Sequence, residues 1–129
     1  MLAIDTNLIV RYLVGDDLGQ AARARRLIDS NDVFVCTTVL LETERVLRSV
    51  YGFSAAQCAK ALSDFAGLPG VSLEDATAAA KALDWIRQGM DFADGLHLAG
   101  AEGFEAFVSF DEDFAKAANA LGGIKVRAP

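Results

Sequence analysis

Four carboxylates stand where a folded chain could bring them together: Asp5, Glu42, Asp94 and Asp111. Each lies at the end of an apolar run or at the edge of an apolar helix face. Clustered carboxylates repel and raise one another's pKa unless a positive charge lies between them. Mg²⁺ is a hard cation that takes oxygen ligands from carboxylates, water and phosphate groups. The four positions therefore indicate metal-dependent chemistry on phosphoryl groups or phosphodiester bonds.

Short apolar runs and helical patterns alternate along the chain, and together they must position these acids. Brief apolar runs predict buried strands, and apolar residues at helical spacing predict helices. The predicted strands are 2–4, 33–36, 71–73, 106–108 and 124–126, and the predicted helices are 7–13, 18–28, 38–51, 54–65, 76–87, 91–102 and 112–121. This alternation is typical of a parallel sheet covered by helices on both faces. We therefore predict one α/β domain over residues 1–129, with a central, mostly parallel sheet of about five short strands.

Two of the acids follow predicted strands directly. In open sheets of this kind, ligands bind outside the carboxyl ends of the strands. Asp5 closes the first strand, and Asp111 follows the strand at 106–108 by a few residues. Chain geometry alone therefore places both at the edge of the sheet where a ligand is expected.

The other two acids lie on predicted helices. At about 100° per residue from Glu42, the apolar residues of its helix fall on an arc from roughly 40° to 160°. Glu42 therefore borders the predicted core stripe, and Glu44 is expected beyond its far side, in water. Asp94 shares a face with Leu98 and Ala101, with no Lys or Arg three or four residues away. A charge in that position is costly unless a partner comes from elsewhere.

Each acid also has an ordinary structural interpretation. Asp5 is a suitable cap for the first helix, and Asp111 is a suitable cap for the helix at 112–121. Ser109 offers that helix a second cap, at capping-box spacing from a Glu. Asp94 would occupy the third position of a helix capped by Asp91, where a carboxylate suits the helix dipole. Each interpretation is plausible singly, but all four acids at one edge of a sheet favour a functional site.

Composition limits the class of protein. With 53% hydrophobic residues, a chain of 129 residues can build one core. Its apolar runs are too short for a membrane span of about 20 residues, and no secretory signal follows Met1. Cys36 and Cys58 lack the spacing of a metal or redox motif. Reduced thiols in a cytoplasmic protein are the simplest interpretation.

The net charge of −6 is unevenly distributed. Residues 1–60 carry seven basic and seven acidic side chains, whereas residues 61–129 carry five basic and eleven acidic ones. This balance argues against binding to duplex DNA as the main activity. It is compatible with a nuclease whose acidic site is neutralised by metal.

The basic side chains and the histidine each leave two interpretations open. The arginines within 23–26 are more simply a solvated helix face than an RNA groove. Arg45, next to Glu42 on its solvent side, is a better candidate for a phosphate contact, although it could equally pair with an acid. His97 is more simply a hydrogen-bonded core or interface residue than a ligand or base.

Four segments taken together resemble a known family. The segments Ile-Asp-Thr-Asn at 4–7, Val-Leu-Leu-Glu-Thr-Glu-Arg-Val-Leu at 39–47, Asp-Phe-Ala-Asp-Gly-Leu-His-Leu-Ala at 91–99 and Val-Ser-Phe-Asp-Glu-Asp-Phe at 108–114 are similar, in this order, to those of PIN-domain ribonucleases. Among these, the short form resembles the VapC-type toxins of bacterial type II toxin–antitoxin modules. The resemblance runs from residue 2 to about residue 126.

The resemblance implies an activity and the residues that carry it. The acidic quartet of the family falls on Asp5, Glu42, Asp94 and Asp111, which would bind Mg²⁺ or Mn²⁺ and cleave RNA. Further positions would support the metal or touch the substrate: Thr6, Asn7, Arg45, Asp91, Ser109 and Asp113. RNA as the substrate follows from the resemblance, not from composition.

The resemblance also implies partners. Such toxins are typically cytoplasmic homodimers neutralised by a small antitoxin, whose C-terminal segment covers the acidic groove and often inserts an Arg. The acidic second half of this chain would attract a basic peptide. The apolar helices at 7–13 and 54–65 could receive an amphipathic partner. No membrane association is expected.

Two rival functions remain open. The first is a phosphotransfer or phosphatase α/β domain, in which an Asp after the first strand is phosphorylated. Phosphatases of the haloacid type have a second Asp two residues after that one, and this chain has Asn7 there. The second rival keeps the fold without the chemistry, as a catalytically silent PIN-like scaffold that binds RNA or a partner.

Overall fold

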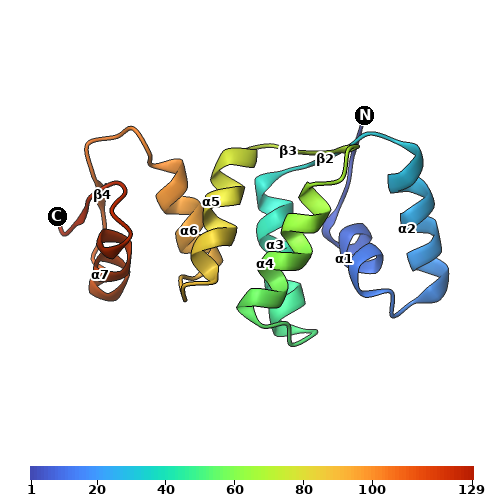
Figure 1. The fold of residues 1–129 in the computed structure, drawn as a ribbon, viewed down its shortest axis with the longest axis horizontal. Coiled ribbons are helices and arrows are strands. Elements are labelled where there is room, and N and C mark those ends of the chain that lie inside the picture. Colours follow the sequence, from blue (N-terminus) through green and yellow to red (C-terminus); the bar gives the residue numbers. More distant parts are fainter. The chain divides into compact units, whose positions relative to one another are not determined.

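The computed structural model describes residues 1–129 and contains seven helices and five strands (Figure 1). In chain order they are β1 (Leu2–Ala3), α1 (Thr6–Val14), α2 (Leu18–Ser30), β2 (Val33–Val35), α3 (Thr37–Ser49), α4 (Ala55–Ala66), β3 (Val71–Leu73), α5 (Ala76–Ile86), α6 (Phe92–Gly100), β4 (Phe107–Val108), α7 (Glu112–Ala120) and β5 (Val126–Arg127). The chain divides into two compact units, Met1–Thr77 and Ala78–Pro129. The single domain over residues 1–129 stays a prediction. None of the helices combines the length and the apolar character that crossing a membrane would need.

The first unit is built on a three-stranded parallel sheet in the order β1-β2-β3. Val33 in the central strand pairs with Leu2 on one side and with Val71 on the other. Val33 and Val35 are fully buried, as expected for a β-branched strand inside a covered sheet. The three strands predicted for this part of the chain are confirmed to within one residue at their ends.

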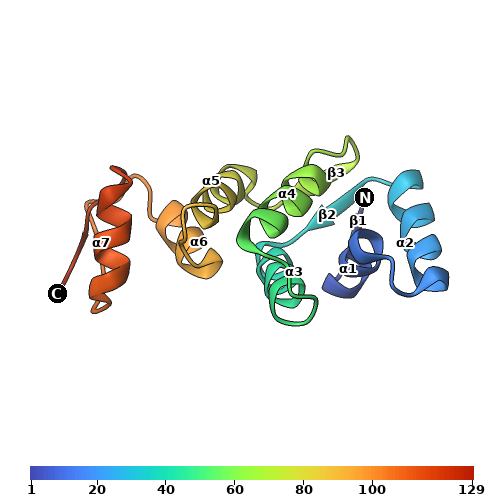
Figure 2. The same cartoon turned by 60° about the horizontal axis from the view of Figure 1, so that its bottom comes forward.

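Four helices pack around this sheet. Helix α1 contacts α2 and α3, and α4 contacts α3 and β3; in both views α3 and α4 lie side by side (Figure 1 and Figure 2). Helix α1 ends at Gly15, whose φ of 70° is a left-handed conformation that glycine adopts without strain. Ser54 is the N-cap of α4, and it forms a complete capping box with Gln57. These local signals fix where the helices begin and end.

The second unit contains α5, α6, α7 and a two-stranded parallel sheet of β4 and β5. Its core includes Leu98, Phe114, Ala118 and Val126, and the rings of Phe107 and Phe114 meet edge to face at 5.5 Å. Helix and strand types are as predicted along the whole unit.

The prediction of one sheet of about five strands was wrong in its connectivity. The five parallel strands form two sheets, of three and of two strands. The last strand is Val126–Arg127 and not 124–126. Strands β4 and β5 have two residues each, and the bonds Phe107 N–H to Lys125 O (2.8 Å) and Ser109 N–H to Arg127 O (3.0 Å) join them to each other. These bonds pair β4 with β5, so each of the two short strands has its partner within the second unit.

Candidate functional site

Asp5 lies at the carboxyl end of β1 and is also the N-cap of α1. Its backbone is extended, and its Oδ1 accepts a hydrogen bond of 2.7 Å from the amide of Thr6. Its side chain is otherwise exposed. Both interpretations of Asp5 therefore hold, because a capping carboxylate at a helix N-terminus still presents an oxygen to solvent.

Two buried threonines connect the first turn of α1 to α3. The hydroxyl of Thr6 donates to the carbonyl of Val39 at 3.4 Å, and the hydroxyl of Thr43 donates to the same carbonyl at 2.7 Å. Asp5 precedes Thr6 and Glu42 precedes Thr43, and consecutive Cα atoms are only about 3.8 Å apart. The shared acceptor therefore holds the backbones of Asp5 and Glu42 near each other inside the first unit. Thr6 is buried, and its hydroxyl is directed at the Val39 carbonyl and not at solvent.

The two glutamates of α3 have the opposite environments from those expected. Glu44 is only 4% exposed, whereas Glu42 is exposed. Nε of Arg48 donates to Oε2 of Glu44 at 3.0 Å, so the buried charge is paired one turn away. The buried residues of the helix follow the i, i+3, i+4, i+7 pattern of Leu40, Thr43, Glu44 and Leu47.

The prediction that Glu44 is left in water was therefore wrong. The predicted apolar arc includes Val50, which is exposed in the structure. The contacts that α3 makes with α1 and α4 decide which face of the helix is buried, and Glu44 lies on that face. Burial, and after it the charge of Glu44, raises the pKa of the Cys58 thiol on α4 to about 11. Glu44 is a structural acid, and Glu42 is the acid of α3 that faces solvent.

Three carboxylates gather in the second unit. Asp91 caps α6 by accepting from the amide of Asp94 at 3.2 Å, and Asp111 caps α7 by accepting from the amide of Phe114 at 2.9 Å. Asp94 is half-buried, and burial raises its pKa above the usual range. The charges of Asp91 and Asp111 raise that pKa further, while His97 opposes them. The predicted caps are thus confirmed, and the unit concentrates negative charge around Asp94.

A close approach of two helices holds Asp94 in place. Gly95 is buried, and a Cβ at this position would lie 3.2 Å from both Cα and Cβ of Ala82 on α5. A side chain at this position would therefore crowd Ala82 and require α5 or α6 to shift by a few tenths of an ångström. The side chains of Lys81 and Glu102 form an ion pair in the same unit. Sequence periodicity gave no signal for this contact between helices.

The residues predicted to support the metal or to touch the substrate differ in their exposure and hydrogen bonds. The hydroxyl of Ser109 accepts from the amide of Asp111 at 3.0 Å, so it orients the cap and does not replace it. Asp113 lies exposed in the first turn of α7. Asn7 and Arg45 are exposed as well, which leaves both free to meet a substrate.

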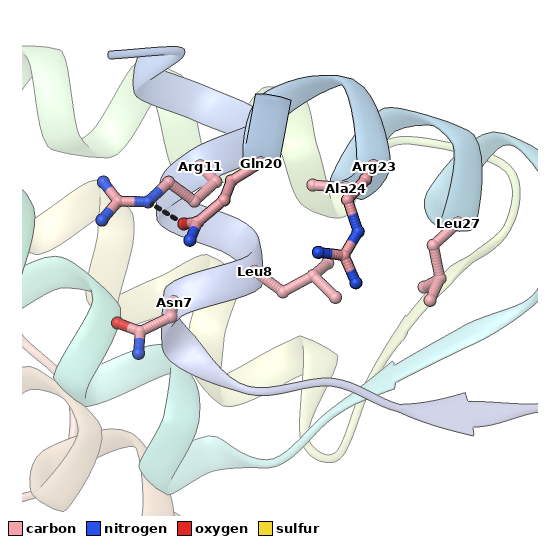
Figure 3. A pocket seen from close by; sticks show the side chains of 7 residues that line it. All are labelled: Asn7, Leu8, Arg11, Gln20, Arg23, Ala24 and Leu27. Atoms are coloured by element: carbon pink, nitrogen blue, oxygen red, sulfur yellow. Dashed lines mark hydrogen bonds between the residues drawn. The ribbon is translucent and has the colours of Figure 1, made fainter. Parts of the chain in front are cut away.

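A hollow of about 270 Å³ opens between α1 and α2. Its first lining residue, Asn7, follows Asp5 by two residues. Figure 3 shows Asn7, Arg11 and Arg23 among the side chains that line it, together with Leu8, Gln20, Ala24 and Leu27. The guanidinium of Arg11 donates hydrogen bonds to Oε1 of Gln20 at 2.7 Å and to Oδ1 of Asp16 at 2.9 Å. The lining of the hollow therefore combines aliphatic side chains with basic and amide groups.

The donor set suits a hard cation, since Mg²⁺ and Mn²⁺ prefer carboxylate oxygens. Neither unit by itself arranges three or more Asp, Glu, His or Cys side chains to hold a metal ion. The first unit offers Asp5 and Glu42, and the second offers Asp94 with Asp91 and Asp111. Burial, and next the charges of Asp91 and Asp111, raise the pKa of Asp94, and a cation would offset those charges.

The family model described as PIN domain matches residues 2–120 of the sequence. The chain belongs to the PIN-domain family. The resemblance read from the four motifs is thereby confirmed at family level. Among solved structures, this PIN chain is similar to VapC20 of Mycobacterium tuberculosis, described as a toxin that cleaves the sarcin–ricin loop. The TM-score is 0.46 with 23% identity, over 98% of this chain and 99% of that chain. No curated protein matches the sequence.

Proposed function

We propose that this PIN-domain chain is a Mg²⁺- or Mn²⁺-dependent endoribonuclease that acts as the toxin of a bacterial toxin–antitoxin pair. The observation that carries the proposal is the half-buried Asp94, whose carboxyl pKa is raised by burial and next by the charges of Asp91 and Asp111. Perturbed carboxylates of this kind are typical of functional sites, because burial and repulsion of the charge cost stability without a structural return. Membership of the PIN family supports a nuclease as the function of this site.

In this proposal Asp5, Glu42, Asp94 and Asp111 hold the metal, directly or through water. A divalent cation supplies a Lewis acid for the scissile phosphate and lowers the pKa of a coordinated water. The chain itself supplies orientation. The Thr6 hydrogen bond to α3 fixes Asp5, the helix cap fixes Asp111 through Phe114, and the tight packing of α6 fixes Asp94.

The supporting roles are divided by exposure. Asn7 and Arg45 are the proposed substrate contacts, because both are exposed and lie close in sequence to Asp5 and Glu42. Asp91 and Asp113 add negative charge beside the proposed metal site. Ser109 keeps the Asp111 backbone in its capping conformation.

The proposed partners follow from the toxin assignment. A small antitoxin would cover the acids with a basic segment, and the excess of six acidic residues after position 60 provides the complementary charge. We also propose that the protein is a homodimer and that it acts in the cytoplasm, where the RNA substrate is found. The second candidate is a PIN-like scaffold that binds RNA or a partner without cutting.

The test is cleavage of a mixed RNA pool by purified, antitoxin-free protein in Mg²⁺, Mn²⁺ or EDTA, beside Asp5→Asn and Asp94→Asn. We expect cutting that requires metal and that both substitutions abolish. Unchanged cutting by either variant would remove that residue from the proposed site. Metal and RNA binding without any cutting of RNA pools from several sources would favour the scaffold.

A further inference from the structure

Phe110 is the most exposed of the large hydrophobic side chains, at 87%. Its exposure continues the alternation of β4. Phe107 packs on Phe114 in the core, Val108 is exposed, Ser109 is half-buried and Phe110 is exposed again. Alternate residues of a strand face opposite sides. Phe110 lies in the bend just after β4, and its side chain is exposed like that of Val108 two residues earlier.

The backbone around Phe110 is held on both sides. The amide of Ser109 donates to Arg127 O at 3.0 Å, which extends the β4–β5 ladder to the residue before the ring. The hydroxyl of Ser109 accepts from the amide of Asp111, and Asp111 caps α7. An apolar ring is thus presented to solvent on a fixed backbone, where it contributes little to the core of its own unit.

We propose that Phe110 is a stacking platform for an unpaired nucleobase of the RNA substrate, next to the scissile phosphate. The inference rests on the proposed function, because it takes Asp111 as one of the metal-binding acids. Phe110 is the residue immediately before Asp111, so its Cα lies about 3.8 Å from that of the acid. A base adjoining the phosphate that reacts at the acids is therefore within reach of the ring.

Three features favour a nucleobase over a protein partner. RNA is recognised mainly in single-stranded regions, where bases stack on aromatic side chains. Phe110 and Val108, which is 49% exposed, form a small apolar surface and not a broad patch, since Glu112 and Asp113 follow the ring and both are exposed. Arg127 lies on the paired strand, and its positive charge suits the phosphate backbone. Each base has a π face, so the platform supplies affinity without strict sequence preference.

The test compares Phe110→Ala with Phe104→Ala, a matched control. Phe104 is 72% exposed in the same unit and lies in the turn after α6, away from Asp111 in sequence. Both are made in the Asp5→Asn background, and the Kd for a single-stranded RNA oligonucleotide is measured by fluorescence anisotropy. Loss of one stacked base is expected to weaken binding roughly 5- to 150-fold for Phe110→Ala. Phe104→Ala should leave the Kd unchanged.

Two further arms separate stacking from general loss of apolar surface. Phe110→Trp should retain the affinity, whereas Phe110→Leu should lose most of it. An oligonucleotide with an abasic site beside the cleavage position should bind equally to the parent and to Phe110→Ala. The melting temperature of Phe110→Ala should equal that of the parent, because the ring is exposed.

The outcomes distinguish this inference from the nuclease itself. If the wild type cuts RNA while Phe110→Ala and Phe104→Ala bind RNA equally well, the platform is refuted and the nuclease stands. If Phe110→Ala changes the oligomeric state measured by light scattering and leaves the RNA Kd unchanged, the ring is a protein contact. If the parent binds no RNA, the proposed function fails, and the platform fails with it.

Discussion

The two glutamates of α3 provide the sharpest test of the assignment. Glu42 and Glu44 are two residues apart on one helix, and each can be changed to Gln with almost no change in shape. The structure gives them different roles, because Glu42 is exposed and Glu44 is buried against Arg48. We expect Glu44→Gln to reduce stability and Glu42→Gln to reduce activity.

The size of the Glu44 effect follows from its contacts. Its side chain is 5% exposed, and it accepts from Arg48 at 3.0 Å and 3.4 Å. A hydrogen bond to a charged group contributes about 1.5 to 3 kcal/mol. The Arg48 side chain is 48% exposed, so water solvates its charge after the substitution, and the loss should be about 2 kcal/mol. At this chain length the melting temperature should fall by roughly 6 to 10 °C.

Glu42→Gln should leave the melting temperature almost unchanged and reduce the rate of RNA cleavage. A substitution at an exposed position away from caps and pairs usually changes the melting temperature by no more than about 2 °C. Loss of a metal-binding carboxylate should lower the rate of RNA cleavage about 100-fold or more, because metal stabilisation of the transition state amounts to several kcal/mol.

The assay combines thermal unfolding in EDTA with RNA cleavage in Mg²⁺, measured at least about 15 °C below both melting temperatures so that each variant is folded. The reasoning is refuted if Glu44→Gln melts with the wild type but no longer cuts, while Glu42→Gln cuts normally. In that case the buried acid would be the catalytic one, and α3 would have to present its opposite face to solvent.

Three further expectations concern other parts of the chain. Because the pKa of Asp94 is raised in the fold, its ionisation destabilises the metal-free protein as pH rises through its titration range; Asp94→Asn should therefore melt above the wild type at pH 7 in EDTA, and not at pH 3. Gly95→Ala should destabilise by about 1 to 3 kcal/mol through crowding of α5, whereas Gly100→Ala, whose Cβ would meet nothing within 4 Å, should be neutral or slightly stabilising in the same melting experiment. Native protein at neutral pH should be alkylated at Cys36 and not at Cys58, as peptide mass mapping would show, since Cys58 is buried and its thiol pKa is about 11; equal labelling of both thiols would contradict that burial.

The sequence determined the local structure of this protein. Helix boundaries follow from residues that act on their immediate neighbours, such as the caps at Asp5, Ser54, Asp91 and Asp111. Short apolar runs predicted five strands, and all five exist. The order of four acidic motifs also identified the PIN family, which the family match confirms. Each of these signals acts over a few residues, so it can be read without knowing what packs on what.

Only the tertiary structure decided which way the elements face and which strands pair. Helical periodicity gives the spacing of a stripe, but the contacts of α3 with α1 and α4 select the face that carries Glu44. The shared acceptor at Val39, joining Thr6 and Thr43, depends on residues more than thirty positions apart. The division into sheets of three and two strands likewise arises from pairing of strands that are separated in the chain by helices. Such contacts depend on geometry in three dimensions, and no spacing along the chain encodes them.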